Sequence, residues 1–301
     1  MKKISASLLA AAVVAMGLTM TTVLPAEANP AYQNNVVTSV TVTTETKAQV
    51  NWEKGAAADI TVVGVGLPPQ NLTPLRGRIL AKRAAIVDGY RLMAETLNGV
   101  QVDAETTVQD MSLASDTVNV KVQALIKGAK IVKEEYLADG SCMVTMSVPL
   151  YGVSGVAGVA LQSAPVATIP SYPTVSPTYK PTGYAQGYTS VIIDADNMGL
   201  EGTFSPVIYD TEGRVIYGMR NLDKDFAISQ GMVEYAGDVA QAYGAFRAGA
   251  RPLVVKAVAV RGGKNSVNPV NVVVSVEDGD KILYAHQESR MLDQRAVVFV
   301  K

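Results

Sequence analysis

The sequence predicts an α+β fold made of two domains that are joined by a proline-rich linker. Three observations support this prediction. A short β-prone run at residues 60–63 leads into a long helical pattern over 75–97. Two further β-prone runs within 129–150 flank an Asp-Gly turn, and residues 152–188 contain five prolines. We therefore expect one mixed domain on each side of the proline-rich stretch.

Residues 1–28 have the pattern of a secretory signal peptide. Two lysines follow Met1, an uncharged apolar stretch runs from Leu8 to Met20, and Ala26-Glu27-Ala28 fits the small-x-small cleavage pattern. A retained membrane anchor is the alternative, but Gly17 interrupts the stretch and Pro25 ends it. We expect an exported protein of the periplasm or cell envelope, peripheral at most to the outer membrane and without a transmembrane anchor in the mature chain.

The net charge and the cysteine count exclude several classes of partner and of covalent linkage. Removing Lys2, Lys3 and Glu27 from 26 basic and 27 acidic residues leaves 24 and 26, a net charge of −2. This balance argues against nucleic acid as a partner, because phosphate binding requires a basic surface. Cys142 is the sole cysteine, so an intramolecular disulfide is excluded, as is lipid attachment at the signal cleavage site. Its alternation with Val144, Met146 and Val148 predicts a buried thiol on the apolar face of a strand.

The first domain is expected over residues 50–151, after an extended lead-in at 29–49. Its strand ends at Gly64-Val65-Gly66, which predicts a turn that lets strand and helix pack closely. Helical spacing then places six side chains on one stripe: Ile79, Arg83, Ile86, Tyr90, Met93 and Leu97.

The rest of this domain is predicted from alternation and capping signals. Residues 100–108 alternate as a half-buried strand does. Ser115 is a predicted N-cap for a helix that ends at Gly128, although 118–122 also alternates and leaves a strand open. Asp139-Gly140 then predicts a hairpin. The element order is β-α-β-α-β-β, with the helices on one sheet.

The linker at 152–188 is expected to be semi-extended, because proline removes backbone donors and fixes φ. Its tyrosines are either parts of a simple tether or docking points for a partner: Tyr172, Tyr179, Tyr184 and Tyr188.

The C-terminal domain, residues 189–301, is predicted to be a β-rich α+β domain. It opens on a β-prone run at 191–193, and a hairpin over 206–217 closes at Gly213. A short helix is expected within 232–246, weakened by two glycines, followed by strands at 252–260 and 271–276. We predict a turn at 277–280, a short segment at 281–287 and an inner strand at 296–300.

These residues together resemble a known family. The Gly64-Val65-Gly66 strand, Ala81-Lys82-Arg83-Ala84-Ala85, Ile126-Lys127-Gly128-Ala129 and Val148-Pro149-Leu150 resemble Lpp-twenty-type bacterial envelope lipoproteins. The N-terminal domain of flagellar assembly protein T is similar. The resemblance covers about residues 58–151 and implies an envelope protein, tied in some relatives to the flagellar basal structure or outer membrane. The lipid-attachment cysteine is missing, and the family implies no enzymatic mechanism.

One cluster of charged residues points to binding. Arg76, Arg78, Lys82 and Arg83 lie in the first turns of the long helix, where positive charge opposes the helix macrodipole. Such a cluster indicates an anionic partner, such as a lipid headgroup, an anionic glycan or an acidic protein. The alternative is a solvated basic face with ordinary pairs such as Arg91 with Glu95.

Other motifs do not predict chemistry. Gly64-x-Gly66 lacks the third glycine of a dinucleotide loop. The run Asp194-Ala195-Asp196-Asn197 begins like a calcium loop, but Met198 stands where an oxygen ligand belongs and Ser205 where a glutamate belongs. His286 is the only histidine, and the sequence gives it no supporting partners for a triad and no Cys, Asp or Glu cluster with the spacing of metal ligands. Widely separated carboxylate pairs of the glycosidase kind stay open. No cofactor is expected.

The sequence thus favours a non-enzymatic envelope protein that acts as an assembly or scaffold component through contacts with envelope proteins. The alternative is a periplasmic binding module for an anionic envelope ligand, held by the basic cluster.

Overall fold

The computed structural model describes residues 47–162, 171–181, 187–218 and 223–301. The predicted signal peptide and most of the predicted lead-in lie outside these ranges. The strands form sheets and the helices pack against them, as expected of the α+β class.

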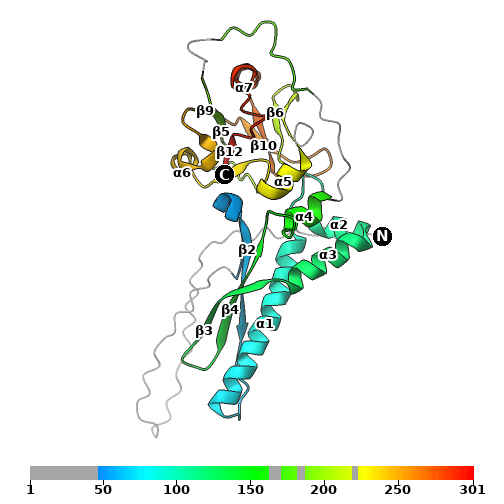
Figure 1. Ribbon diagram of the computed structural model, residues 1–301, viewed down its shortest axis with the longest axis vertical. Helices are drawn as coiled ribbons and strands as arrows, with labels where there is room; N and C mark the ends of the chain where they lie inside the picture. Colours follow the sequence, from blue (N-terminus) through cyan, green and yellow to red (C-terminus); the bar gives the residue numbers. More distant parts are fainter. Residues whose placement is uncertain (1–46, 163–170, 182–186, 219–222) are drawn as a thin grey trace, which may run out of the picture. The chain divides into compact units, whose positions relative to one another are not determined.

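A four-stranded antiparallel sheet with the order β1-β2-β4-β3 forms the first part of the fold (Figure 1). Its strands are β1 (Ala48–Asn51), β2 (Asp59–Gly66), β3 (Lys130–Tyr136) and β4 (Cys142–Pro149). A 3₁₀ turn, η1 (Trp52–Ala57), joins β1 to β2. The predicted hairpin is confirmed, because β3 and β4 pair antiparallel around Asp139-Gly140 and Gly140 has a φ of 83°. β3 is an edge strand whose residues are all exposed.

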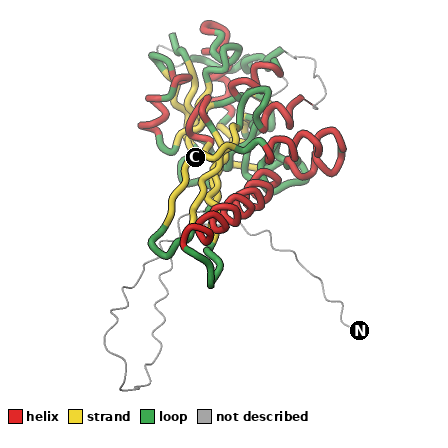
Figure 2. The backbone as a smooth tube through the Cα atoms, turned by 60° about the horizontal axis from the view of Figure 1, so that its bottom comes forward, coloured by secondary structure: helices red, strands yellow, loops and turns green. Residues whose placement is uncertain are grey.

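Helix α1 (Pro74–Asn98) runs along one face of this sheet (Figure 2). The predicted helix is present, but its predicted stripe is only partly right, because Ile86 and Tyr90 are half-buried against the core while Arg83 is exposed. Only Met93 and Leu97 of that stripe are buried, whereas Ile79 is 48% exposed. The rest of the buried face consists of small residues: Gly77, Ala81, Ala85 and Gly89.

The reason for this small-residue face lies in β2. A Cβ atom added to Gly64 would collide with the carbonyl oxygen of Ala85, and one added to Gly66 with that of Ala81. The helix backbone therefore sits directly on the strand backbone, and only small side chains fit between them.

The predicted strand at 100–108 is wrong. Gln101 and Thr107 form only an isolated bridge, and α2 (Val108–Ala114) begins immediately afterwards. Thr107 and Asp110 form a capping box, in which each side chain binds the other's backbone amide. The helix option at 115–128 is confirmed as α3 (Asp116–Lys127), with Ser115 as the N-cap.

Two described segments of the predicted linker, residues 156–162 and 171–181, pack against other parts of the chain. Helix α4 (Val156–Gln162) is almost entirely buried, which the sequence did not predict. Residues 171–181 lie against helix α7 (Val276–Ser289). Tyr172 makes an edge contact with His286 at a ring distance of 4.2 Å, and Tyr179 approaches Tyr284 at 6.0 Å. These two tyrosines thus pack within the chain itself.

A buried ionic cluster fastens the 171–181 segment to α7. Asp280 Oδ1 accepts hydrogen bonds from the Ser176 amide and from Arg214 Nη1, both at 3.0 Å. Arg214 Nε also pairs with the fully buried Asp210. Arg214 thus bridges two carboxylates, so each buried acid has a cationic partner although the cluster as a whole keeps one net negative charge.

Residues 190–301 form two further four-stranded sheets. The first is entirely parallel, in the order β8-β12-β5-β9, with β5 (Ser190–Asp194), β8 (Glu234–Ala236), β9 (Pro252–Lys256) and β12 (Val297–Val300). β12 is an inner strand with all four residues buried, as predicted. The second is mixed, in the order β10-β11-β6-β7, with β6 (Ile208–Asp210), β7 (Val215–Tyr217), β10 (Ala259–Arg261) and β11 (Asn271–Val274).

The helices of this part include α5 (Lys224–Gln230), α6 (Val239–Gly244), η3 (Phe246–Ala248) and α7. The turn predicted at 277–280 is wrong, because these residues form the first turns of α7. Ser275 caps the helix by accepting a hydrogen bond from the Asp278 amide. A Cβ on Gly279 would lie 3.2 Å from Ile216 Cδ1, so this glycine permits close packing.

Residues 47–301 cluster as one compact unit, and a single apolar core includes side chains from before and after the proline-rich stretch. Trp52 is part of this core, and its ring centre lies 5.0 Å from that of Phe204 and 5.7 Å from that of Tyr235. The domain boundaries named from the sequence stay a prediction. No helix in the described ranges combines the length and apolar character needed to span a bilayer.

Candidate functional site

The end of the first sheet at which α1 begins carries the basic cluster. β2 ends at Gly66, residues 67–73 form a loop, and Pro74 starts the helix. Pro68 lies between the helix and the β3–β4 turn, because Cβ atoms on Gly77 and Gly140 would be 3.4 and 3.5 Å from its ring. The loop, the first turns of α1 and the hairpin turn therefore form one continuous end (Figure 1).

Five of the large aliphatic side chains exposed at this end, each more than 40% exposed, form what we call the apolar end. They are Leu67 (69% exposed), Leu72 (42%), Leu75 (71%), Ile79 (48%) and Leu137 (45%). Single exposed leucines are ordinary, but a group from three adjoining segments at the same end of a fold is typical of an interaction surface.

Two of the four predicted basic residues contact strand β3. The Arg78 guanidinium lies 5.2 Å from the ring centre of Tyr136, within range of a cation–π contact. Lys82 Nζ forms an ion pair with Glu134 at 2.6 Å. The hydrogen bond between these groups raises the pKa of Lys82 and lowers that of Glu134.

The other two, Arg76 and Arg83, are exposed. Within the described part of the chain, no acidic side chain forms an ion pair with either guanidinium. The first turn of α1 also contains no acidic residue, and the Thr73 side chain makes no capping hydrogen bond. The apolar end is therefore flanked by positive charge that the nearby residues leave uncompensated.

Further along α1 the charges are paired. Arg91 binds Glu95 at 2.7 Å, which confirms the predicted pair, and also binds Asp88 at 2.8 Å. The basic character is thus concentrated in the first turns of the helix.

Gly64 and Gly66 lie within β2, so their assignment to a turn is wrong. The close approach of strand and helix that motivated this assignment is nevertheless what both glycines provide. Cys142 is fully buried in β4 as predicted, and burial raises the pKa of its thiol, which disfavours the thiolate form.

The calcium-like run and the single histidine both have structural roles. Asp194 Oδ1 accepts the Asp196 amide at 3.1 Å, and Asn197 and Gly199 have left-handed φ angles, so this run forms a turn after β5. His286 is buried on α7 beneath Tyr172. In the described ranges, His, Cys, Asp and Glu side chains nowhere gather in groups of three suited to a metal ion.

Sequence reasoning found the basic cluster but missed the exposed leucines beside it. Leu67, Leu72 and Leu75 stand in a short uncharged run of Pro, Gln, Asn and Thr. An aliphatic residue repeating through such a loop is the signal that indicates an exposed apolar surface.

Comparison with known proteins gives a match for one part of the chain. Residues 190–301 match a protein-family model described as the second domain of Treponema pallidum Tp0624. This part is therefore similar to that domain. The match begins at the first residue of β5 and ends at the last residue of the chain. A search of curated proteins found no match.

Proposed function

We propose that this chain is an exported, non-enzymatic cell-envelope protein that acts as an assembly or scaffold component, attached to an anionic lipid surface through the apolar end. The predicted signal peptide and the resemblance to Lpp-twenty-type lipoproteins support the compartment. A link to flagellar or outer-membrane structures rests on the same resemblance.

One observation carries the attachment: five exposed aliphatic side chains lie beside Arg76 and Arg83, whose charges are uncompensated locally. Burying apolar area in a membrane interface contributes about 25 cal/mol per Å². A basic residue near an anionic surface adds about 1 kcal/mol. The two terms act at the same end of the molecule and reinforce each other.

Attachment of this kind suits a chain whose only cysteine is buried in β4. The covalent lipid of the resembling family requires a cysteine near the start of the mature chain. Reversible binding through apolar and basic side chains supplies a non-covalent alternative.

Vesicle flotation of the mature chain, residues 29–301, tests the attachment. We expect binding to vesicles that contain phosphatidylglycerol, little binding to pure phosphatidylcholine, and weakening as salt rises. Replacing Arg76 and Arg83 together with alanine removes about 2 kcal/mol and should weaken binding about thirtyfold. Leu75→Ser should also weaken it, whereas Val87→Ser is the matched control, because Val87 is 69% exposed on the same helix but outside the apolar end.

Equal losses in Leu75→Ser and Val87→Ser would contradict attachment by this end. Salt-sensitive binding to a soluble anionic glycan, with no binding to vesicles, would instead favour the periplasmic binding module.

In-cell crosslinking of the tagged chain, followed by envelope fractionation and mass spectrometry, tests the scaffold role. Recovery of one or two envelope proteins in stoichiometric amounts is expected. A fraction without any enriched partner would contradict the role.

A further inference from the structure

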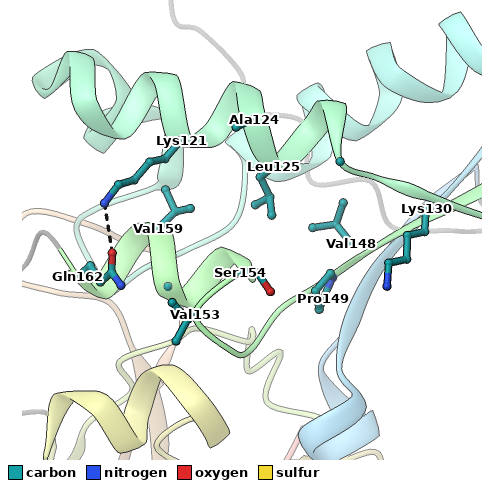
Figure 3. A pocket seen from close by; sticks show the side chains of 12 residues that line it. Lys121, Ala124, Leu125, Lys130, Val148, Pro149, Val153, Ser154, Val159 and Gln162 are labelled. Atoms are coloured by element: carbon teal, nitrogen blue, oxygen red, sulfur yellow. Dashed lines mark hydrogen bonds between the residues drawn. The ribbon is translucent and has the colours of Figure 1, made fainter.

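A groove of about 490 Å³ lies between α3, α4 and the end of β4 (Figure 3). Its size is within the range of small-ligand sites, about 300–1,000 Å³. None of its lining residues belongs to the apolar end, so the groove is a separate feature of the fold.

The walls of the groove are apolar. Eight of the twelve lining residues have no polar side-chain atom, including Leu125 from α3, Val148 from β4 and Val159 from α4 (Figure 3). Val153 is 75% exposed beside it, so the groove opens to solvent. A concave and open apolar surface of this kind favours an apolar ligand over bulk water.

A lysine stands at each end of the groove (Figure 3). Lys121 Nζ donates a hydrogen bond to Gln162 Oε1 at 3.2 Å, which joins α3 to α4 at one end. Lys130 stands at the other end, and no Asp or Glu is among the lining residues. The charge of the groove is therefore positive and favours an anionic group.

We propose that this groove binds a single-chain amphiphile with an anionic headgroup, such as a fatty acid. The chain lies along the apolar walls and the headgroup pairs with Lys121. This inference does not depend on the attachment proposed above.

Lys121 is the better headgroup partner of the two lysines. It is half-buried, whereas Lys130 is exposed, and its amine is positioned by a side chain from another helix. A positioned and partly desolvated charge interacts more strongly with an anion than a mobile exposed one does. An extended peptide is a poorer occupant, because Ser154 and Gln162 supply the only neutral polar side chains on the walls.

Isothermal titration of the mature chain with dodecanoate, below its micellar concentration, tests the inference. We expect saturable binding with one dodecanoate per chain, and about tenfold weaker binding of dodecanol, which lacks the charge. Lys121→Gln should weaken dodecanoate binding by a similar factor. The matched control is Lys127→Gln, because Lys127 is exposed on the same helix and does not line the groove.

Blocking variants test the location. Ala124→Trp and, independently, Val153→Trp should abolish binding by filling the groove from exposed positions, and circular dichroism should show that both variants stay folded. Leu75→Ser, at the apolar end, should leave dodecanoate binding unchanged. Absence of saturable binding, unaltered binding in the folded blocking variants, or equal losses in Lys121→Gln and Lys127→Gln would each overturn the inference.

Discussion

Glycine positions in β2 illustrate how single residues set the fold of the first sheet. Gly64 faces the backbone of α1 at Ala85 and Gly89, and Gly66 faces it at Ala81 and Ala85. Neither φ angle is positive, so the reason for glycine is space alone. A methyl group at either position must push the helix away from the strand, because the obstructing atoms are backbone atoms.

We expect Gly64→Ala to lower the free energy of unfolding by about 3 kcal/mol, the upper part of the range for overpacked cores. Chemical denaturation measures the loss. Gly244→Ala is the matched control: nothing lies within 4 Å of a Cβ there, so its effect should stay within about 1 kcal/mol. Equal stabilities of the two variants would contradict the close contact between β2 and α1.

We expect His286 to give the protein a pH dependence that begins near the ordinary histidine pKa of about 6.5. Burial lowers the pKa of this imidazole; Asp293 opposes the shift, Arg290 adds to it, and Tyr172 covers the ring. The unfolded chain, with a histidine pKa of about 6.5, then binds the proton more readily than the folded chain does. Stability should therefore fall as the pH decreases below about 6.5 toward the lower folded pKa.

The slope of unfolding free energy against pH between 7 and 5 measures this effect. His286→Gln should flatten the slope whatever its effect on absolute stability. A slope that persists in the variant would assign the titration to another group.

At the scale of elements, the sequence predicted those whose local signals agree with their packing. The hairpin at Asp139-Gly140, the long helix and strand β12 needed only turn chemistry and periodicity. Errors arose where glycine served packing instead of a turn: Gly279 inside α7 resembled a turn signal, and the small residues of α1 concealed its buried face. Helix α4 was missed because its buried Val-Ala-Gly-Val-Ala-Leu run has no polar face.

The candidate site also has features that the sequence predicts and features that depend on the folded structure. The charges of Arg76, Arg78, Lys82 and Arg83 are visible in the sequence, and their helix was predicted. The contacts of Arg78 with Tyr136 and of Lys82 with Glu134 were not predictable, because both partners belong to a strand about fifty residues away in the chain. The grouping of Leu67, Leu75 and Leu137 likewise depends on the position of the hairpin turn.

The contact between the 171–181 segment and α7 is an element-scale feature that hydrogen exchange can measure. We expect the Ser176 amide to be protected, since Asp280 Oδ1 accepts its hydrogen at 3.0 Å. Asp280→Ala should remove that protection and lower stability by about 3 kcal/mol, because Arg214 loses one of its two partners.

Glu277→Ala, an exposed change one helical turn earlier, is the control and should preserve the protection. Rapid exchange of the Ser176 amide in the unaltered protein would contradict the docked segment.

At the scale of the whole molecule, Trp52 joins the two parts of the described chain. It comes from the connection between β1 and β2, and it packs against Phe204 and Tyr235 from beyond the proline-rich stretch. Gly202 accommodates it, because a Cβ at that position would overlap the indole ring. Trp52 is also the only tryptophan, so its fluorescence reports on this contact specifically.

We expect thermal unfolding followed by tryptophan fluorescence and by circular dichroism to give the same midpoint in the unaltered protein. Trp52→Ala should cost about 3–5 kcal/mol. By calorimetry, this variant should unfold in two separate steps, because the ring contacts of Trp52 with Phe204 and Tyr235 are lost. A single transition shifted to lower temperature would show that other contacts suffice to couple them.

The backbone contact between α1 and β2 also has a mechanical consequence. A 25-residue helix is about 37 Å long, and between Ala81 and Gly89 its backbone lies directly against Gly64 and Gly66 of the strand. The helix and the sheet should therefore behave as one rigid unit, a lever that resists bending. One end of this lever carries the apolar surface, while β2 begins near Trp52 at the other. A force applied at the apolar end would then be transmitted along α1 and β2 toward Trp52.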